Sequence, residues 1–475
     1  MKNFIKFLKT DVKIINSYFL FTIILIILVC VGYSSYALFS FTKTSTNVIE
    51  GTVGELKKNI DTSGANEPVL ASNMIPVYYD ETNDVWKKAN KDNMDKNNPW
   101  YSYNSTGEYK GMWANAVTVI GTNRTKYLNA TPGTVIPMDD ITTMWVWIPR
   151  FNATTPSNYN GGTQALPNAI YVTFVKPNET AIDAFTFGNK ELSGFWYAKF
   201  ETSHSTLTSS TTNNNLGCSN ERCSNANGII IKPNVKSLRR NNISNLFFAS
   251  RSMEQTGNSF GFVSTEVDTH MSKNNEWGAV AYLTQSIYGR CTDSTTCSEV
   301  GINNSHDSNN NLTTGYGAPA GSDENVTNGA YNTTLGKNAS TTGTIYGIYD
   351  MSGGASEYVM GVFADTNGKP RSGYNSSDNS GFTGMLKDGT TYTGITFPDS
   401  KYYNLYTESS YTGHALTETK NWYSDSASFV STFYPWFIRG GYSLNSKYAG
   451  VFNFNYYSGA SNSYYYSSRL VITNE

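Results

Sequence analysis

The sequence predicts an α+β protein in which short strands and long loops outweigh helices, behind an N-terminal transmembrane helix. From residue 74 onward, aromatic and β-branched residues come in short runs that Asn, Gly and Asp separate, which is typical of strands and turns. Helical spacing of apolar residues is found in few places. A basic N-terminus precedes a long uncharged apolar stretch, which is typical of a membrane span.

Three segments are expected to be strands of a buried core: MWANAVTVIG (112–121), TTMWVWIPRF (142–151) and ELSGFWYAKFETS (191–203). Trp145 and Trp147 are two residues apart, so they share one face of a strand. We expect both in the core, rather than on a surface that stacks against sugars.

Helices are predicted over 241–257 and 274–289, where apolar residues recur at intervals of three and four. The segments 203–228 and 303–329 are rich in Asn, Ser, Thr and Gly, and we expect them to be surface loops. The chain has no repeat of fixed period.

The composition argues against a nucleic-acid partner. The chain of 475 residues has a formal net charge of −2, so it offers no strongly basic face. Only 15% of the residues are charged, whereas 14% are aromatic and 34 are Tyr. Such a weakly charged surface is more typical of secreted, strand-rich proteins than of cytosolic enzymes.

The N-terminus predicts export. Lysines at positions 2, 6, 9 and 13 precede an uncharged stretch at 18–38, centred on FLFTIILIILVCV. About 20 apolar residues span a bilayer, and the basic flank remains in the cytoplasm. We therefore expect a single-pass protein of the cell membrane with an extracellular C-terminal part. A cleaved signal peptide, ending near Ser35-Tyr36-Ala37, is the alternative and would give a secreted protein.

The predicted organisation has five parts: a cytoplasmic basic segment (1–17), an anchor or signal (18–38), a spacer (39–73), a β-rich N-terminal part (74–140) and the main domain (141–475).

The cysteines agree with an oxidising compartment. Cys30 lies in the apolar stretch, and the other four form two local pairs, Cys218/Cys223 and Cys291/Cys297. We expect each pair to form a disulfide. A zinc site of four thiolates is less favoured, because the spacings are loose and no His flanks them.

Four segments, in order, resemble the formylglycine-generating enzyme family, also known as sulfatase-modifying factors. They are MSKNNEWGAVAYL (271–283), YGIYDMSGGASEYVMG (346–361), FIRGGYS (437–443) and SSRLVI (467–472). The resemblance covers roughly residues 140–475 and implies a C-type-lectin-like fold, in which little regular structure supports large loops.

The resemblance argues against the family's chemistry. Asn445 and Gly450 stand where the oxidase members have their two cysteines, and neither can bind copper as a thiolate. The iron-dependent branch needs clustered histidines, but the four histidines here are scattered, at positions 204, 270, 306 and 414. We therefore predict a protein without enzymatic activity and without a catalytic residue.

The C-terminal stretch is more similar to the variable proteins of diversity-generating retroelements, which are bacterial or phage surface proteins with a C-type-lectin-like domain. Fixed positions of that pattern are matched at 439–441, 449–452, 454, 459–460 and 469–471. Of the 27 positions from 442 to 468, 20 are Tyr, Asn, Ser or Phe, while one is Lys and none is Ile. The alternative explanation of this composition is codon drift in an AT-rich genome. Such drift should also raise the content of Lys and Ile.

The positions between the fixed ones are predicted to contact a ligand and, under this resemblance, to vary. They are Tyr442, Ser443, Asn445, Ser446, Tyr448, Asn453, Asn455, Tyr456, Tyr457, Ser461, Asn462, Ser463, Tyr464, Tyr465 and Tyr466.

The residue types at these positions also favour contact with a ligand. Tyr presents a large ring with few torsions to order, and Ser and Asn add adaptable hydrogen bonds, as in antibody loops. Strand alternation predicts that Phe452 and Phe454 point into the core, while Asn453 and Asn455 point outward. The successive tyrosines at 464–466 cannot share one face of a strand, so at least one should be exposed.

Other candidate sites are weaker. Glu276 and Glu357 are expected to form structural salt bridges or to bind a cation, rather than to act as a general acid and base. The segment 363–381 has Asp and Asn near Gly but lacks the spacing of a defined cation motif. We predict no cofactor. The sequence leaves a structural calcium ion as an alternative and does not identify any other metal.

These observations together predict a membrane-anchored adhesin or receptor that binds a protein or a glycan. Two alternatives are a metal-dependent oxidoreductase on the same scaffold and a structural component of a surface assembly.

Overall fold

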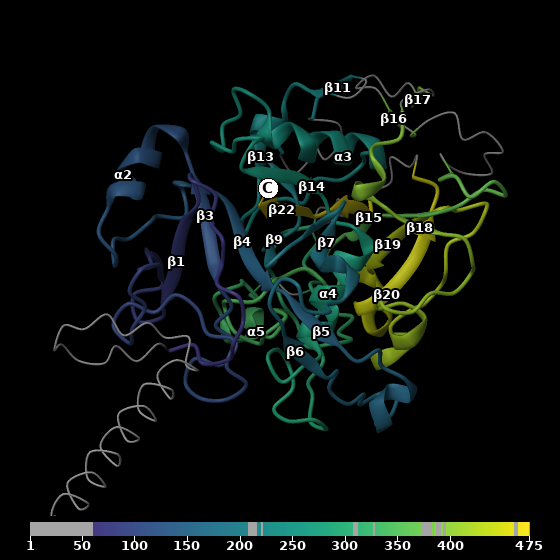
Figure 1. The fold of residues 1–475 in the computed structure, drawn as a ribbon, viewed down its shortest axis with the longest axis horizontal. Helices are drawn as coiled ribbons and strands as arrows, with labels where there is room; N and C mark the ends of the chain where they lie inside the picture. The colour runs from purple at the N-terminus through teal and green to yellow at the C-terminus, as the bar shows by residue number, and fades with distance from the viewer. Residues whose placement is uncertain are drawn as a thin grey trace, which may run out of the picture. The chain divides into compact units, whose positions relative to one another are not determined.

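The structure is a computed structural model of the chain (Figure 1). It describes residues 60–207, 216–219, 222–306, 312–325, 328–371, 382, 384–385, 391–392, 396–459 and 464–474. Residues 58–475 form one compact unit. Among the residues described, we find no helix that combines the length and the apolar character needed to cross a lipid bilayer. The predicted span at 18–38 lies outside them.

The larger sheet has seven strands, and every neighbouring pair is antiparallel. Their order is β14 (Val267–Met271), β22 (Leu470–Asn474), β9 (Gly194–Ala198), β4 (Ile141–Pro149), β3 (Asn115–Val119), β1 (Ile75–Asp80) and β2 (Val85–Lys88). The strands predicted over 112–121, 142–151 and 191–203 are confirmed as β3, β4 and β9. The last strand of the chain, β22, lies inside this sheet, between β14 and β9.

The smaller sheet has five strands and carries the C-terminal stretch. Its order is β18 (Asn404–Tyr406), β15 (Ser356–Phe363), β19 (Trp436–Gly440) and β20 (Gly450–Tyr457), and β21 (Tyr466–Ser468) also pairs with β15. β15 runs parallel to β18 and β21 but antiparallel to β19. A sheet-rich structure with few helices confirms the α+β class.

The two predicted helices are confirmed as α3 (Ile243–Arg251), which packs on β14, and α4 (Asn274–Thr284), which contacts β15. Asn242 caps α3, because its side chain accepts a hydrogen bond from the backbone N–H of Asn245. Every residue of α4 is buried. A helix that is buried on all sides belongs to the interior of a domain.

The remaining elements are short. The helices are α2 (Arg124–Asn129) and α5 (Thr334–Lys337). The two-stranded pairs are β5 (Phe151–Ala153) with β6 (Val172–Phe174), β7 (Thr186–Phe187) with β8 (Lys190–Glu191), β10 (Ser203–His204) with β13 (Ile229–Ile230), β11 (Cys218–Ser219) with β12 (Arg222–Cys223), and β16 (Gly384–Met385) with β17 (Thr391–Tyr392). Single 3₁₀ turns are η1 (Gly121–Asn123), η2 (Asn158–Gly161), η3 (Asp183–Phe185), η4 (Ala226–Gly228), η5 (Ser252–Glu254), η6 (Ser400–Tyr402), η7 (Thr417–Thr419), η8 (Trp422–Ser424) and η9 (Ser443–Tyr448).

The core is rich in tryptophan. Trp145 and Trp147 of β4 are buried, which confirms the prediction that they belong to the core. Their indole N–H groups donate to the Thr143 hydroxyl at 2.7 Å and to the Asn66 carbonyl at 3.1 Å. Each ring is therefore buried without leaving its donor unsatisfied.

The expectation of surface loops at 203–228 and 303–329 is wrong for several of their described residues. His204, Cys218 and Asn303 are buried. The amide of Asn303 donates to the Thr313 carbonyl at 2.9 Å and to Asp350 at 2.8 Å. A polar side chain is buried at little cost when its hydrogen bonds are made inside the protein, and composition alone does not reveal such partners.

Both predicted cysteine pairs are disulfides in the structure, Cys218 with Cys223 and Cys291 with Cys297. The first joins β11 to β12 beside α3.

One buried ion pair connects the two sheets. Arg469 is the residue between β21 and β22, where the chain passes from the smaller sheet into the larger one. Its guanidinium donates to both carboxylate oxygens of Glu357 on β15, at 3.0 and 2.5 Å. It also donates to the carbonyl of Ala198, the last residue of β9, at 2.9 Å. Burial alone would lower the pKa of Arg469, but the Glu357 carboxylate outweighs this effect and raises it.

Replacing Arg469 with Met should lower the free energy of unfolding by roughly 3–5 kcal/mol, because the Glu357 carboxylate is left buried without its partner. Chemical denaturation of the full chain measures this loss. Lys337→Ala breaks the more exposed pair with Glu81 and is the control, with an expected change within about 0.5 kcal/mol. Similar losses in the two variants would contradict the importance of the buried pair.

Candidate functional site

The C-terminal stretch is held by buried residues. On β20, Phe452 and Phe454 are each 2% exposed, as predicted. The Phe452 N–H donates to the Asp425 carboxylate at 2.9 Å. The indole of Trp277, on α4, donates to the carbonyl of Val451 at 2.9 Å. These contacts fix the strand from its buried side.

The fixed positions of the C-terminal pattern and the predicted contact positions differ in burial. Every fixed position that the structure describes is buried. Twelve of the fifteen predicted contact positions are described, and ten of these twelve are exposed or half-buried. Ser461, Asn462 and Ser463 lie outside the described residues.

Four tyrosines are the most exposed of these positions: Tyr448 at 52%, Tyr464 at 45%, Tyr456 at 37% and Tyr465 at 36%. The prediction that at least one residue of 464–466 is exposed is therefore confirmed. The half-buried positions are Tyr442, Asn445, Ser446, Asn455, Tyr457 and Tyr466.

Two predicted contact positions are buried. Ser443 and Asn453 are each 3% exposed, so the prediction that Asn453 points outward is wrong. Its amide donates to the carbonyl of Tyr448 at 2.7 Å and thereby holds η9 against β20. Alternation along a strand predicts that a side chain is exposed only where its face of the strand is open to solvent. Here η9 covers the face on which Asn453 lies.

Six of the tyrosine rings contact another tyrosine ring, in two groups. Tyr434 stacks on Tyr456 with ring centroids 5.2 Å apart, and it also lies 6.2 Å from Tyr457. Tyr457 contacts Tyr466 at 4.5 Å. Tyr442 contacts Tyr465 at 4.8 Å.

Tyr466 is half-buried beside Tyr457. Burial raises its pKa, and the neighbouring hydroxyls of Tyr457, Tyr442 and Tyr465 raise it further. We define the tyrosine surface as Tyr434, Tyr442, Tyr448, Tyr456, Tyr457, Tyr464, Tyr465 and Tyr466.

An arginine far away in the sequence fixes one end of the tyrosine surface. The Arg240 guanidinium lies 4.1 Å from the centre of the Tyr464 ring and donates to the Tyr464 hydroxyl at 3.0 Å. Arg239 donates to the Tyr464 carbonyl at 2.6 Å. A cation over a ring face is attracted by the electrons of the ring.

Sequence reasoning missed several members of this region. Tyr434 and Phe433 lie just before the Tyr/Asn/Ser-rich window, and Arg240 lies about 200 residues before it. Phe433 is 52% exposed. The adjacent aromatic residues 433 and 434, which precede the FIRGGYS motif, were an available signal for the first two, whereas the contact with Arg240 depends on tertiary structure.

The two positions where the oxidase family has cysteines have local structural roles here. The Asn445 side chain accepts a hydrogen bond from the Tyr442 N–H at 2.8 Å, which closes the turn of η9. At Gly450, a Cβ atom would lie 2.1 Å from the Asp425 carboxylate, so the packing requires glycine. In the described part of the chain, no group of three or more His, Cys, Asp or Glu side chains is arranged to hold a metal ion.

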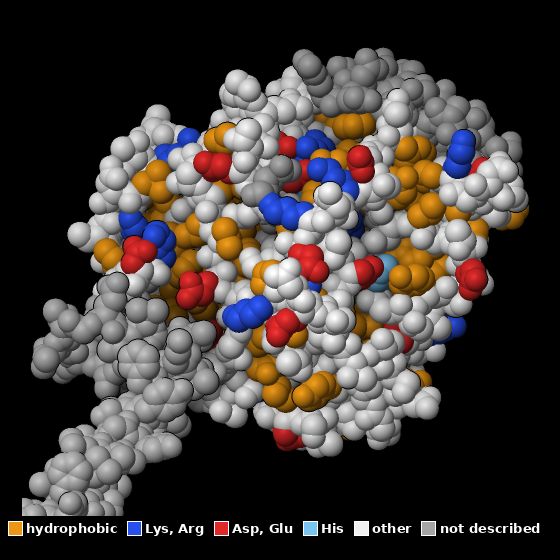
Figure 2. Space-filling model, in the orientation of Figure 1, with side chains coloured by type: hydrophobic (Ala, Val, Ile, Leu, Met, Phe, Trp, Pro, Cys, Tyr) orange, Lys and Arg blue, Asp and Glu red, His pale blue; other side chains and the backbone are white. Residues whose placement is uncertain are grey.

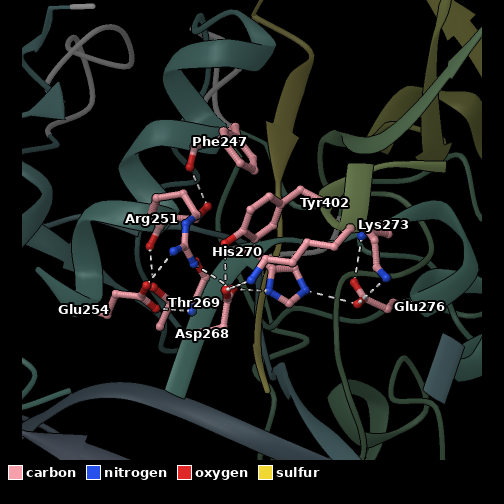
Figure 3. Close-up of polar contacts among 11 residues, drawn as sticks. Phe247, Arg251, Glu254, Asp268, Thr269, His270, Lys273, Glu276 and Tyr402 are labelled. Carbon is pink, nitrogen blue, oxygen red and sulfur yellow. Dashed lines mark hydrogen bonds and ion pairs between the residues drawn. The ribbon is translucent and has the colours of Figure 1, made fainter. Parts of the chain in front are cut away.

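A second polar cluster surrounds His270 on β14 (Figure 3). His270 lies between Asp268 and Glu276, at 3.0 Å from each. Glu276 also pairs with Lys273 at 3.6 Å, and Asp268 pairs with Arg251 at 2.6 Å. Burial alone would lower the pKa of His270, but Glu276 and Asp268 together raise it.

This cluster has the features of a structural network. His270, Asp268 and Glu276 are all buried, and Phe187 stacks on the imidazole at 4.7 Å. Glu276 pairs with His270 and Lys273, and Glu357 pairs with Arg469. The prediction of structural salt bridges at the two glutamates is confirmed.

Exposed and buried rings of β20 should respond differently to truncation. Phe454→Ala should lower the free energy of unfolding by about 3–5 kcal/mol, because it leaves a cavity in the core. Tyr456→Ser, two residues along the same strand, should change it by less than about 1 kcal/mol. Chemical denaturation of both variants measures these changes in the free energy of unfolding. A large loss of stability in Tyr456→Ser would show that the ring belongs to the core.

The His270 cluster predicts a pH dependence with a definite sign. Because the folded-state pKa is raised above 6.5, the stabilisation by His270 is complete below pH 6.5 and is lost as the pH rises through the folded-state value. The difference in unfolding free energy between the native chain and His270→Gln should therefore fall between pH 6 and 9, by at most about 1.4 kcal/mol per pH unit. A constant or rising difference would contradict this assignment.

No protein-family model matches the chain, and no curated protein matches it significantly. The resemblance to the formylglycine-generating enzyme family therefore rests on the four motifs and their arrangement.

Proposed function

We propose that this protein binds a macromolecular partner through the tyrosine surface. The observation that carries the proposal is the concentration of exposed rings. Fourteen large hydrophobic side chains are exposed among the described residues, and six of them lie between residues 433 and 465. Clustered exposed apolar groups generally mark interaction sites, whereas scattered ones do not.

The tyrosine surface suits binding energetically. A tyrosine has few torsions to order, and each ring offers apolar area together with a hydroxyl group. Six of the rings contact another ring of the surface, and three of them (Tyr456, Tyr457 and Tyr466) lie on the strands β20 and β21, most of whose other residues are buried. Less conformational entropy is therefore lost when a partner binds.

A protein is the favoured partner class. The tyrosine surface extends over four segments: the residues before β19, η9, the end of β20 and the residues around β21. Protein interfaces are enriched in Tyr and depleted of Lys, Glu and Asp. On the face drawn in Figure 2, white areas, which are uncharged polar side chains and backbone, are more extensive than the red and blue charged groups. A glycan is the alternative ligand and is an outcome of the test below.

We also propose the lectin-like scaffold that the motifs imply. Three contacts among the four motif segments support it. Met360 donates its N–H to the Ser272 carbonyl at 2.8 Å, Arg439 donates to Asn274 at 3.0 Å, and Arg469 pairs with Glu357. Motifs that matched by chance would have no reason to meet in one buried junction.

Diversification of the tail is part of the same proposal. Its support is the burial pattern: the fixed positions are buried, whereas ten of the twelve described contact positions have solvent access. Such an arrangement lets the contact residues change with little loss of stability. Under this proposal the protein is a non-enzymatic adhesin or receptor that residues 18–38 anchor in the membrane of a bacterial cell.

The proposal is tested with two matched sets of substitutions in the full chain. Tyr448, Tyr456, Tyr464 and Tyr465 are changed to Ser in one variant. In the control, four exposed residues of comparable accessibility elsewhere, Val69, Ile120, Val263 and Leu405, are changed to Ser. Detergent-purified protein is immobilised and screened against arrays of surface proteins and of glycans.

The tyrosine variant should lose at least tenfold in affinity for the partner found with the native chain, while the control retains it. Both variants should keep the native melting temperature within a few degrees. Equal binding by the two variants would refute the proposal. A partner found only on the glycan array, and lost in the tyrosine variant, would refute the protein class but leave the tyrosine surface in place.

A further inference from the structure

A second surface feature lies far from the C-terminal strands in the sequence. Residues between 154 and 171 line an open hollow of about 470 Å³. This segment connects β5 to β6, and the two strands are labelled in the lower part of Figure 1. Its lining residues are Thr154, Ser157, Asn158, Asn160, Gly161, Ala169 and Tyr171. No member of this lining set carries a charge.

Tyr171 gives the hollow an aromatic wall. Its side chain is 71% exposed, the highest value among the exposed large hydrophobic side chains of the described residues. Tyr171 directly precedes β6, and its carbonyl accepts a hydrogen bond from the Thr154 N–H at 3.1 Å. The backbone that carries the ring is therefore fixed, although the ring itself is in solvent.

Two polar side chains of the lining are available to a ligand. In the part of the chain that the structure describes, neither the Asn158 amide nor the Thr154 hydroxyl makes a hydrogen bond. The Asn160 amide, by contrast, is used internally: it donates to the Ala169 carbonyl at 2.9 Å and accepts from the Ser157 N–H at 3.2 Å.

The floor of the hollow has an unusual backbone. Asn158, Tyr159, Asn160 and Gly161 all have positive φ angles, of 46°, 55°, 53° and 85°. Each non-glycine residue in this region costs of order 1 kcal/mol or more, so the surrounding structure must hold it in place. Asn168 does so, because its N–H donates to the Tyr159 carbonyl at 3.0 Å and its amide donates to the Asn160 carbonyl at 3.0 Å.

We propose that this hollow binds a neutral saccharide. One face of a pyranose ring consists of C–H groups and packs against an aromatic ring such as Tyr171, while its hydroxyl groups need amide and hydroxyl partners such as Asn158 and Thr154. A concave site with an aromatic wall and a few convergent polar groups is the usual form of a small-ligand site. The absence of charge in the lining disfavours phosphorylated, sulfated and sialylated sugars, because their anionic groups would be desolvated without a cation.

This site is independent of the tyrosine surface. Residues 423–426 lie between the two regions, because the Tyr423 N–H donates to the Gln164 carbonyl at 2.7 Å and the Ser426 N–H donates to the Tyr448 carbonyl at 3.0 Å. They share no lining residue, so one site can fail its test without the other.

The probes are maltotriose, cellotriose and chitotriose, with 3′-sialyllactose as a charged comparison. Each is titrated against the full chain, and binding is followed by saturation-transfer NMR. At least one neutral trisaccharide should bind, and more tightly than the sialylated one. Tyr171→Ala should weaken binding at least tenfold, whereas Tyr171→Phe should retain it because the ring face remains. Asn158→Gly, which the positive φ angle tolerates, should weaken binding severalfold.

Tyr456→Ser is the matched control for an exposed tyrosine outside the hollow, and it should bind the saccharide normally. The proposal is overturned if none of the neutral trisaccharides binds, or if Tyr171→Ala binds as well as the native chain. Loss of binding in Tyr456→Ser alone would assign the saccharide to the tyrosine surface and would also overturn it.

Discussion

The Arg469 guanidinium donates to a carboxylate of the smaller sheet and to a carbonyl of the larger one, and these buried contacts join the two sheets. It lies where the chain passes from β21 to β22, so its side chain contacts both sheets at the point where they meet. A buried charge is tolerated only when it is paired and its donors are used. The polar groups around Arg469 are therefore a requirement of the fold, and the last strands cannot move independently of β9 and β15.

This constraint explains how a stretch so rich in Tyr, Asn and Ser can fold at all. Such a composition by itself buries little apolar area. The buried members of the stretch, Phe452 and Phe454, face the core, and Arg469 connects its end to the sheets. The exposed members of the stretch, such as Tyr448 and Tyr456, add little to the core, whereas Asn453 is buried where η9 packs on β20.

The buried charges around His270 are paired in the same way. The surface has few charged residues, yet several ionisable groups are buried in pairs or networks, around His270 and around Arg469. Inside a protein such pairs specify one arrangement of the segments that they join, because any other arrangement leaves a charge unpaired. The hollow beside Tyr171 and the tyrosine surface lie outside these networks, where uncharged polar side chains dominate.

The sequence by itself determined the class of fold, the strands at β3, β4 and β9, the two main helices and the core tryptophans, since each depends on local periodicity and apolar content. It also predicted that part of the 464–466 cluster is exposed, because three consecutive residues cannot share a strand face. Tertiary structure alone decided that Asn453 is buried, that Arg240 lies on Tyr464, that the polar segments near His204 and Asn303 enter the interior, and that a hollow forms beside Tyr171. Most of these features depend on a partner tens to hundreds of residues away, or on a rare backbone conformation that neighbouring segments hold in place. The burial of Asn453 depends instead on how the nearby turn η9 folds back onto β20.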